Sequence, residues 1–303
     1  MVDTLVMAAA DCRTAPEAWL AFVKPTDTVG IKVSAAPGRA GGSRHEIATA
    51  VAAGLRQAGL PRDRIIVWDR NQSDLLAAGY RTDSPDYTLR WIDPAKGYDT
   101  SAQVIAPVLG KLIWGDSSFG DRRISRFSDL FDTNEQLSSK SHFSRILTKE
   151  VTRVIHITSA SDSIYTGIHG ALADMTLSNI DNWRRFTKPP DHGDPYIAEI
   201  YGDETIRSKV VLTFLDALVV QFAGGPHPNP QFTAVNGAIF ASRDPVALDA
   251  TLIDLIEPLR KASQLPPVRP MSRYVESAQI LGLGEILPSR IETIRVGVEA
   301  LNR

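Results

Sequence analysis

The sequence predicts a soluble α/β protein with a mainly parallel, doubly wound sheet and helices on both faces. The main observation is the segment 28–69, where an apolar run at 29–33 leads through a glycine-rich loop and a helix into a second apolar run at 64–69. Such a unit normally joins two parallel strands by a right-handed crossover. Parallel sheets are in turn covered on both faces, so helices are expected on each side.

The individual elements follow from local signals. Ser43 and Glu46 have the spacing of a capping box, which predicts the start of the helix in this unit, and Gly59 marks its end. Further apolar runs predict strands at 89–92, 111–114, 151–157, 210–215 and 238–242. Two polar, aperiodic stretches, 115–141 and 182–195, predict long insert loops within a single domain, 1–303.

Composition excludes several classes of protein. The 33 basic and 35 acidic residues give a net charge of -2 without a basic run, which argues against nucleic acid as a partner. No stretch approaches the roughly 20 apolar residues of a membrane helix, so no membrane insertion is expected. The single cysteine, Cys12, excludes an internal disulfide, a cysteine-ligated zinc site and a self-contained iron–sulfur cluster. We expect a cytoplasmic location for the chain as given, and a periplasmic or exported one if an upstream twin-arginine signal was trimmed.

The glycine-rich loop 35–43 is a candidate anion site. It lies between a predicted strand and a helix N-terminus, where free N–H groups and the helix dipole favour a phosphate or carboxylate. Its spacing matches neither the dinucleotide fingerprint nor the P-loop, so a flexible connecting loop is the alternative. The candidate ligand-binding residues here are Lys32, Arg39, Ser43, Arg44 and His45.

Several aspartates are expected at buried or strand-end positions. Asp244 precedes a proline and should cap a helix running to about Glu257. Asp249 falls on the apolar face of that helix and needs a cation, a basic side chain or backbone N–H groups as partner. Asp216 and Asp69 close apolar runs at the carboxyl ends of strands, where open α/β sheets bind ligands. A structural role is the alternative for each.

Two histidine-containing segments are further candidates. Glycines flank His169, as if an imidazole pointed into a cleft, although a helix start that needs small residues gives the same pattern. His192 and Asp194, in the loop 191–194, are candidate ligands for a divalent metal. The alternative is a solvated turn in which an aspartate caps the next helix. We find no serine elbow that would indicate a hydrolase triad.

An ordered series of motifs resembles the family called domain of unknown function 362 and covers most of the chain. The motifs are VGIKV at 29–33, RIIVWD at 64–69, the segment 167–182, LDA at 215–217 with GGP at 224–226, DPVALD at 244–249 and GLG at 282–284. No single motif is decisive, but their order is fairly specific.

The resemblance implies little about activity, because the family has no general assigned reaction. Some members carry a ferredoxin-like cysteine segment and some a twin-arginine signal, and the sequence given shows neither. Relatives tend to have lysine after the glycine-rich helix start, where Ala173 stands here. The residues carried over as site candidates are Lys32, Asp69, His169, Asn182, Asp216 and Asp249.

Three hypotheses about function follow. The first is an enzyme acting on a small anionic molecule, with His169, Asp216 and Asp249 as catalytic candidates. The second is a non-catalytic ligand-binding or accessory protein with a degenerate site. The third is a homodimer surface formed by aromatic side chains of the middle loop, at Trp114, Phe119, Phe127 and Phe131.

Overall fold

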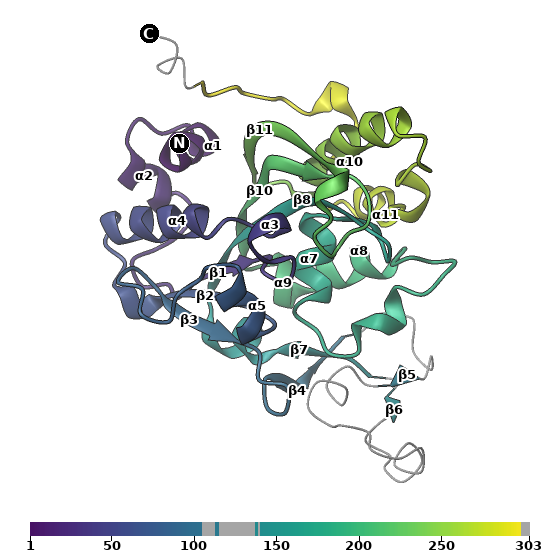
Figure 1. The fold of residues 1–303 in the computed structure, drawn as a ribbon. Helices are drawn as coiled ribbons and strands as arrows, with labels where there is room; N and C mark the ends of the chain where they lie inside the picture. Colours follow the sequence, from purple (N-terminus) through teal and green to yellow (C-terminus); the bar gives the residue numbers. More distant parts are fainter. Residues whose placement is uncertain (105–112, 115–136, 139, 298–303) are drawn as a thin grey trace.

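The computed structural model describes residues 1–104, 113–114, 137–138 and 140–297 (Figure 1). Its centre is a seven-stranded sheet with the order β11-β10-β8-β1-β2-β3, and β9 pairs with β8 beside this path. The pairs from β10 to β3 are parallel, whereas β11 and β9 are antiparallel to their neighbours. The predicted fold class, a mainly parallel α/β sheet with helices, is therefore confirmed.

The elements have the following bounds. The strands of the large sheet are β1 (Val29–Val33), β2 (Ile65–Asp69), β3 (Thr88–Trp91), β8 (Arg153–Ser163), β9 (Gly167–His169), β10 (Val210–Gln221) and β11 (Thr233–Ser242). Two small antiparallel pairs join β4 (Tyr98–Gln103) to β7 (His142–Ser144) and β5 (Ile113–Trp114) to β6 (Leu137–Ser138). Short turns of other helix types lie at Arg62–Arg64, Ile146–Glu150, Trp183–Phe186, Pro230–Phe232, Arg269–Met271 and Pro288–Arg290.

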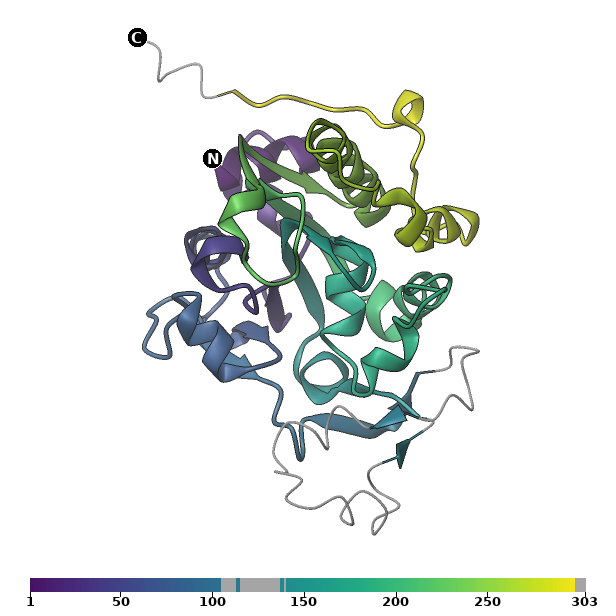
Figure 2. The ribbon, with the colours of Figure 1, turned by 45° about the vertical axis from the view of Figure 1, so that its right-hand side comes forward.

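Helices cover both faces of the large sheet (Figures 1 and 2). One face carries α1 (Val2–Ala10), α2 (Ala15–Leu20), α4 (His45–Gln57) and α5 (Gln72–Ala77), whose apolar residues share one core cluster. The other carries α7 (Ala171–Leu177), α8 (Tyr196–Tyr201), α10 (Pro245–Ala262) and α11 (Tyr274–Ile280), which share a second cluster. The remaining helices are α3 (Gly38–Gly41) and α9 (Glu204–Arg207).

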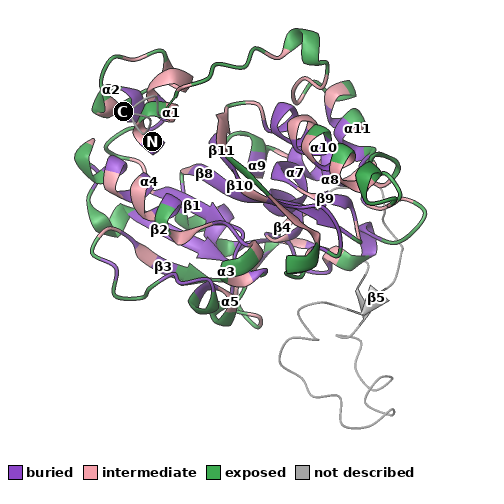
Figure 3. Ribbon diagram, turned by 45° about the horizontal axis from the view of Figure 1, so that its top comes forward, coloured by how far each residue is buried: buried purple, intermediate pink, exposed green. Residues whose placement is uncertain are grey.

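The strand period of two decides which side chains reach each core. In β1, Val29, Ile31 and Val33 belong to the cluster beneath α4, whereas Lys32 between them bonds to Asp174 of α7 on the other face. All five residues of β1 are buried, and Figure 3 shows the central strands as mostly buried. A lysine at position 32 is consequently held inside the protein rather than at its surface.

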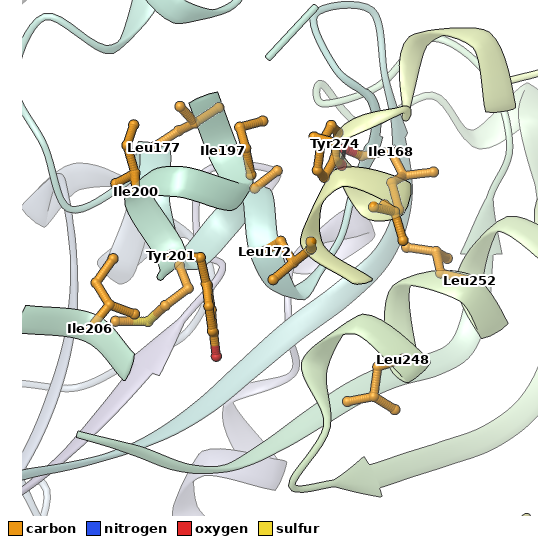
Figure 4. Close-up of a cluster of buried hydrophobic side chains, with 14 of the residues drawn as sticks. Ile168, Leu172, Leu177, Ile197, Ile200, Tyr201, Ile206, Leu248, Leu252 and Tyr274 are labelled. Carbon is orange, nitrogen blue, oxygen red and sulfur yellow. Dashed lines mark hydrogen bonds between the residues drawn. The ribbon is translucent and has the colours of Figure 1, made fainter. Parts of the chain in front are cut away.

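The core beneath α7 is a close-packed cluster (Figure 4). Leu172 of α7, Ile197 and Tyr201 of α8, and Leu252 of α10 are all buried in it. This packing holds α7 against the sheet, and α7 carries several of the polar groups described below.

Two local predictions were wrong. The strand predicted to end at Leu215 continues as β10 to Gln221, because β11 pairs with it as far as Gln221, so Asp216 lies within the strand. The capping box is absent: α4 begins at His45, with Arg44 as its N-cap and no side-chain cap. The Ser43 hydroxyl instead contacts Ser34 and Tyr80.

The middle loop lies largely outside the described residues. Phe119, Phe127 and Phe131, predicted to form a dimer surface, are among the residues not described. Only residues 113–114 of the strand predicted at 111–114 are described, as the strand β5 that contains Trp114. No helix in the described part of the chain is long and apolar enough to cross a membrane.

The Asp244 cap provides a test of the fold at the start of α10. Its Oδ1 accepts hydrogen bonds from the N–H groups of Val246 and Ala247, both at 2.9 Å, and its Oδ2 accepts one from Glu285 at 2.8 Å. We expect Asp244→Ala to lower the free energy of unfolding by about 1–2 kcal/mol, measured by urea denaturation. Asp254→Ala is the control, because Asp254 lies on the same helix with its side chain 57% exposed. Equal losses in the two variants would contradict the capping role.

Candidate functional site

A cavity of about 380 Å³ opens where β1, β2 and β9 end beside α7. Ser34 follows β1, Asp69 ends β2 and His169 ends β9, so three strand ends supply its polar wall. This is the edge of a parallel sheet at which ligands normally bind. The cavity is lined by Ser34, Ala36, Asp69, Arg70, Asn71, Asp74, Ser163, Tyr165, Thr166, His169, Asp174, Leu177, Ser178, Trp183, Arg184 and Pro226.

Below this wall the ammonium group of Lys32 is completely buried. Its Nζ lies 3.0 Å from Oδ1 of Asp69 and 3.1 Å from Oδ1 of Asp174, and it donates a hydrogen bond to the carbonyl of Val33 at 2.6 Å. These three acceptors match the three donors of an ammonium group. A buried charge is tolerated only when it is paired and hydrogen-bonded in this way.

The electrostatics keep this cluster ionised. Burial by itself would lower the pKa of Lys32, but Asp174 and Asp69 outweigh it and raise the pKa above its ordinary value of 10.5. Burial likewise opposes ionisation of Asp174, yet Lys32, His156 and His169 hold the pKa of that carboxyl well below 3.8. At neutral pH, Asp174 is a carboxylate and Lys32 an ammonium ion.

Asp174 also fixes the hydrogen positions on two imidazoles. Nε2 of His156 lies 2.8 Å from its Oδ2, and Nε2 of His169 lies 3.3 Å from its Oδ1. Because an ionised carboxylate only accepts hydrogen bonds, each Nε2 must carry a hydrogen. His156 is fully buried, and burial lowers its pKa, so it is neutral. His169 differs, because its side chain is 18% exposed and lines the cavity.

Asp249 supports the same helix from behind. Its carboxylate accepts hydrogen bonds from the N–H groups of Ala171 and Leu172, the first residues of α7. A Cβ at position 170 would collide with this carboxylate, which explains Gly170. The two N–H groups lower the pKa of Asp249, but burial raises it by more, and the pKa is about 7. The sequence left a cation, a basic side chain or backbone N–H groups as the partner of Asp249, and the structure shows backbone N–H groups.

The other walls combine aromatic surface with a cation. The rings of Tyr165 and Trp183 meet edge to face with centroids 5.5 Å apart. Nη2 of Arg70 donates hydrogen bonds to the carbonyls of Leu177 and Ile180, both at 2.6 Å. These acceptors are neutral, and Arg70 forms no ion pair with any residue that the structure describes. Its positive charge is available to the cavity.

The structure brings together part of the predicted site. Asp69 and His169 line the cavity, Lys32 is enclosed beneath it, and Asp249 holds α7 from the far side. Lys32 reaches His169 through one carboxylate, because both contact Oδ1 of Asp174. The carboxyl edge of the sheet, where the sequence predicted a ligand site, therefore carries a cavity. Some of the polar residues that line it, such as Arg70 and Asp174, were not predicted.

Asp216 and several predicted residues in and beside the glycine-rich loop are not among the residues lining the cavity. Asp216 faces α4: its Oδ1 contacts Nη1 of Arg44 at 2.6 Å and its Oδ2 accepts the N–H of Arg44 at 3.0 Å. The carboxylate of Asp216 thus accepts the N–H of the N-cap residue of α4, at the helix terminus where the sequence predicted a bound anion. Arg39 and His45 lie beside Gly79, and neither they nor Ser43 are among the residues lining the cavity.

The residues predicted in the second loop have structural partners. Asn182 donates a hydrogen bond to the carbonyl of Lys140 at 2.7 Å. His192 Nδ1 lies 3.1 Å from the carbonyl oxygen of Tyr165, and Asp194 accepts a hydrogen bond from Ser277 at 2.6 Å rather than capping α8. In the described parts of the chain, no three His, Cys, Asp or Glu side chains are grouped as metal ligands.

Sequence reasoning missed Asp174, His156, Ser34 and Arg70. Two of them had a usable signal, since Ser34 continues the strand alternation of Lys32, and Arg70 directly follows the strand-end Asp69. Asp174 lies in a seven-residue helix that is buried at every position, so no amphipathic pattern marks it.

Comparisons with known proteins found one structure that resembles this chain. No family model matches the sequence, and no curated protein matches it. One structural match is the crystal structure of a Thermotoga maritima protein determined by a structural genomics consortium, with a TM-score of 0.43 and 12% sequence identity. The match covers 88% of this chain and 59% of the other, so this chain spans less than two thirds of that protein.

The raised pKa of Asp249 predicts a pH dependence of stability. A carboxyl whose pKa is higher in the folded state stabilises the fold below about pH 4, and this contribution is lost as the pH rises through about 7. The free energy of unfolding of the wild type, relative to that of Asp249→Asn, should therefore fall from pH 4 to pH 8. The change has an upper limit of about 4 kcal/mol. Urea denaturation at several pH values measures it, and a difference that stays constant with pH would contradict the assignment.

Proposed function

We propose that the protein is an enzyme that binds a small carboxylate- or phosphate-bearing molecule in this cavity and transfers a proton at His169. The observation that carries the proposal is the His169–Asp174 pair, in which a carboxylate orients an imidazole that lines a cavity. A positioned imidazole with such a carboxylate is a common general base or acid.

The hydrogen-bond arrangement supports a particular direction of transfer. Nε2–H of His169 faces Asp174, so in the neutral ring Nδ1 carries the free lone pair and is the atom that accepts a proton from the ligand. Asp174 is itself held by Lys32 and by the hydroxyl of Ser178 at 3.0 Å. The imidazole is thereby fixed before the ligand arrives, as general base catalysis requires.

The anionic group of the ligand is assigned to Arg70 rather than to Lys32. Lys32 is enclosed and neutralised by two carboxylates, so it offers no charge to a ligand. Arg70 lines the cavity, and its guanidinium is fixed by the carbonyl groups of Leu177, which ends α7, and Ile180, which follows it. A guanidinium with remaining N–H donors is well suited to a carboxylate or phosphate.

A non-catalytic ligand-binding protein is the second candidate, and the enclosure of Lys32 by two carboxylates favours it.

Ala173, where relatives of the proposed family tend to have lysine, is fully buried and is not among the residues lining the cavity. The alanine therefore leaves the cavity wall described above intact. Membership in the domain of unknown function 362 family remains a proposal that rests on the ordered motifs.

The experiment is a ligand screen followed by a proton-exchange assay. Carboxylates and phosphate esters that raise the unfolding temperature of the protein are incubated with it in ²H₂O and followed by proton NMR, which detects both exchange and product. We expect His169→Asn to reduce turnover by about 10²–10⁴-fold while binding is retained. Arg70→Gln should weaken binding of the same compounds.

Matched variants separate the site from general effects. His45→Asn replaces a histidine outside the cavity, and Arg90→Gln replaces an arginine of β3 whose side chain is 53% exposed. Neither should change turnover or affinity. Binding without exchange or product in the wild type would establish the binding protein instead, and turnover that survives His169→Asn would remove the assigned role of the imidazole.

A further inference from the structure

Ser34 is a buried serine on the cavity wall whose hydroxyl is unpaired. The residue is only 1% exposed, and its Oγ has no hydrogen-bond partner among the residues that the structure describes. Its backbone is satisfied, because its N–H donates to Oγ of Ser43 at 2.9 Å and its carbonyl accepts from the N–H of Ser43 at 2.8 Å. The position is well fixed, and only the hydroxyl lacks a partner.

An unpaired buried hydroxyl lowers the stability of a protein, so its presence needs an explanation. Other buried side chains in the described structure also hold unpaired polar atoms, among them Thr148, Ser159 and Glu199, but only Ser34 of that group lines the cavity. The strand alternation directs residue 34 to the same face as Lys32, towards α7.

We propose that Ser34 Oγ hydrogen-bonds a hydroxyl group of the ligand, so that the site selects hydroxylated acids over their deoxy analogues. The inference rests on the proposed function and names its substrate class. Asp69, another wall residue, uses Oδ1 for Lys32 and Oδ2 for the N–H of Ala35. Each carboxylate oxygen can accept a further hydrogen bond. A ligand hydroxyl both donates and accepts, so it suits a wall that combines a serine with a carboxylate.

The test uses pairs of compounds that differ in one hydroxyl. Malate and succinate form the carboxylate pair, and 2-hydroxypropyl phosphate and propyl phosphate form the phosphate pair. Dissociation constants are measured by isothermal titration calorimetry. We expect the wild type to bind the hydroxylated member of at least one pair about tenfold more tightly or better, because the deoxy analogue leaves buried polar groups unpaired.

Two serine variants make the test specific. Ser34→Ala should abolish the preference between the members of a pair, whereas a general distortion would weaken both members alike. Ser43→Ala is the matched control, because Ser43 is buried in the same loop but its hydroxyl contacts Ser34 and Tyr80. It should keep the preference. Without ligand, Ser34→Ala should unfold at the wild-type temperature or above, and Ser43→Ala below it.

The outcomes distinguish this inference from the proposed function. If the wild type binds members of a pair equally, or if Ser34→Ala keeps the preference, the role of Ser34 is wrong and the proposed function stands. A lower unfolding temperature for ligand-free Ser34→Ala would show that the hydroxyl already has a partner, which also overturns the inference. If neither member of either pair binds and the wider screen of carboxylates and phosphates finds no ligand, both proposals fail.

Discussion

The contact of the Lys32 ammonium group with the carboxylates of Asp69 and Asp174 is the interaction on which the rest of the cavity depends. It joins three elements, because Lys32 belongs to β1, Asp69 ends β2 and Asp174 belongs to α7. A charge at this depth is tolerated only with complete pairing, so each member constrains the other two. Removing one partner of such a buried pair typically costs about 3–5 kcal/mol.

This constraint places the chemical groups of the cavity. Asp174 remains ionised because Lys32 lies beside it, and an ionised Asp174 fixes the hydrogens of His156 and His169. Asp249 holds the first turn of the same helix by two backbone N–H groups. The part of the wall that α7 carries is therefore set by buried electrostatics on one side and by helix-terminal hydrogen bonds on the other, before any ligand binds.

The sequence predicted the features that depend on local periodicity. The strand–helix–strand unit at 28–69 and the burial of Asp249 on the inner face of α10 follow from residues close together in the chain. Partners distant in the chain could not be inferred: Lys32 and Asp174 are 142 positions apart, and Asp216 and Arg44 are 172 apart. Asp216 was expected at the end of its strand, because the apolar run stops at Leu215, whereas pairing with β11 extends β10 to Gln221.

The central claim is that Lys32 and Asp174 stabilise the fold as a coupled pair. A double-mutant cycle with Lys32→Met and Asp174→Asn, measured as free energies of unfolding in urea at pH 7, tests it most directly. We predict that the double variant is less destabilised than the sum of the single variants, with a coupling energy of about 2 kcal/mol or more, because each single variant deprives the remaining buried charge of one of its partners. Additivity to within about 0.5 kcal/mol would contradict this account of the cavity.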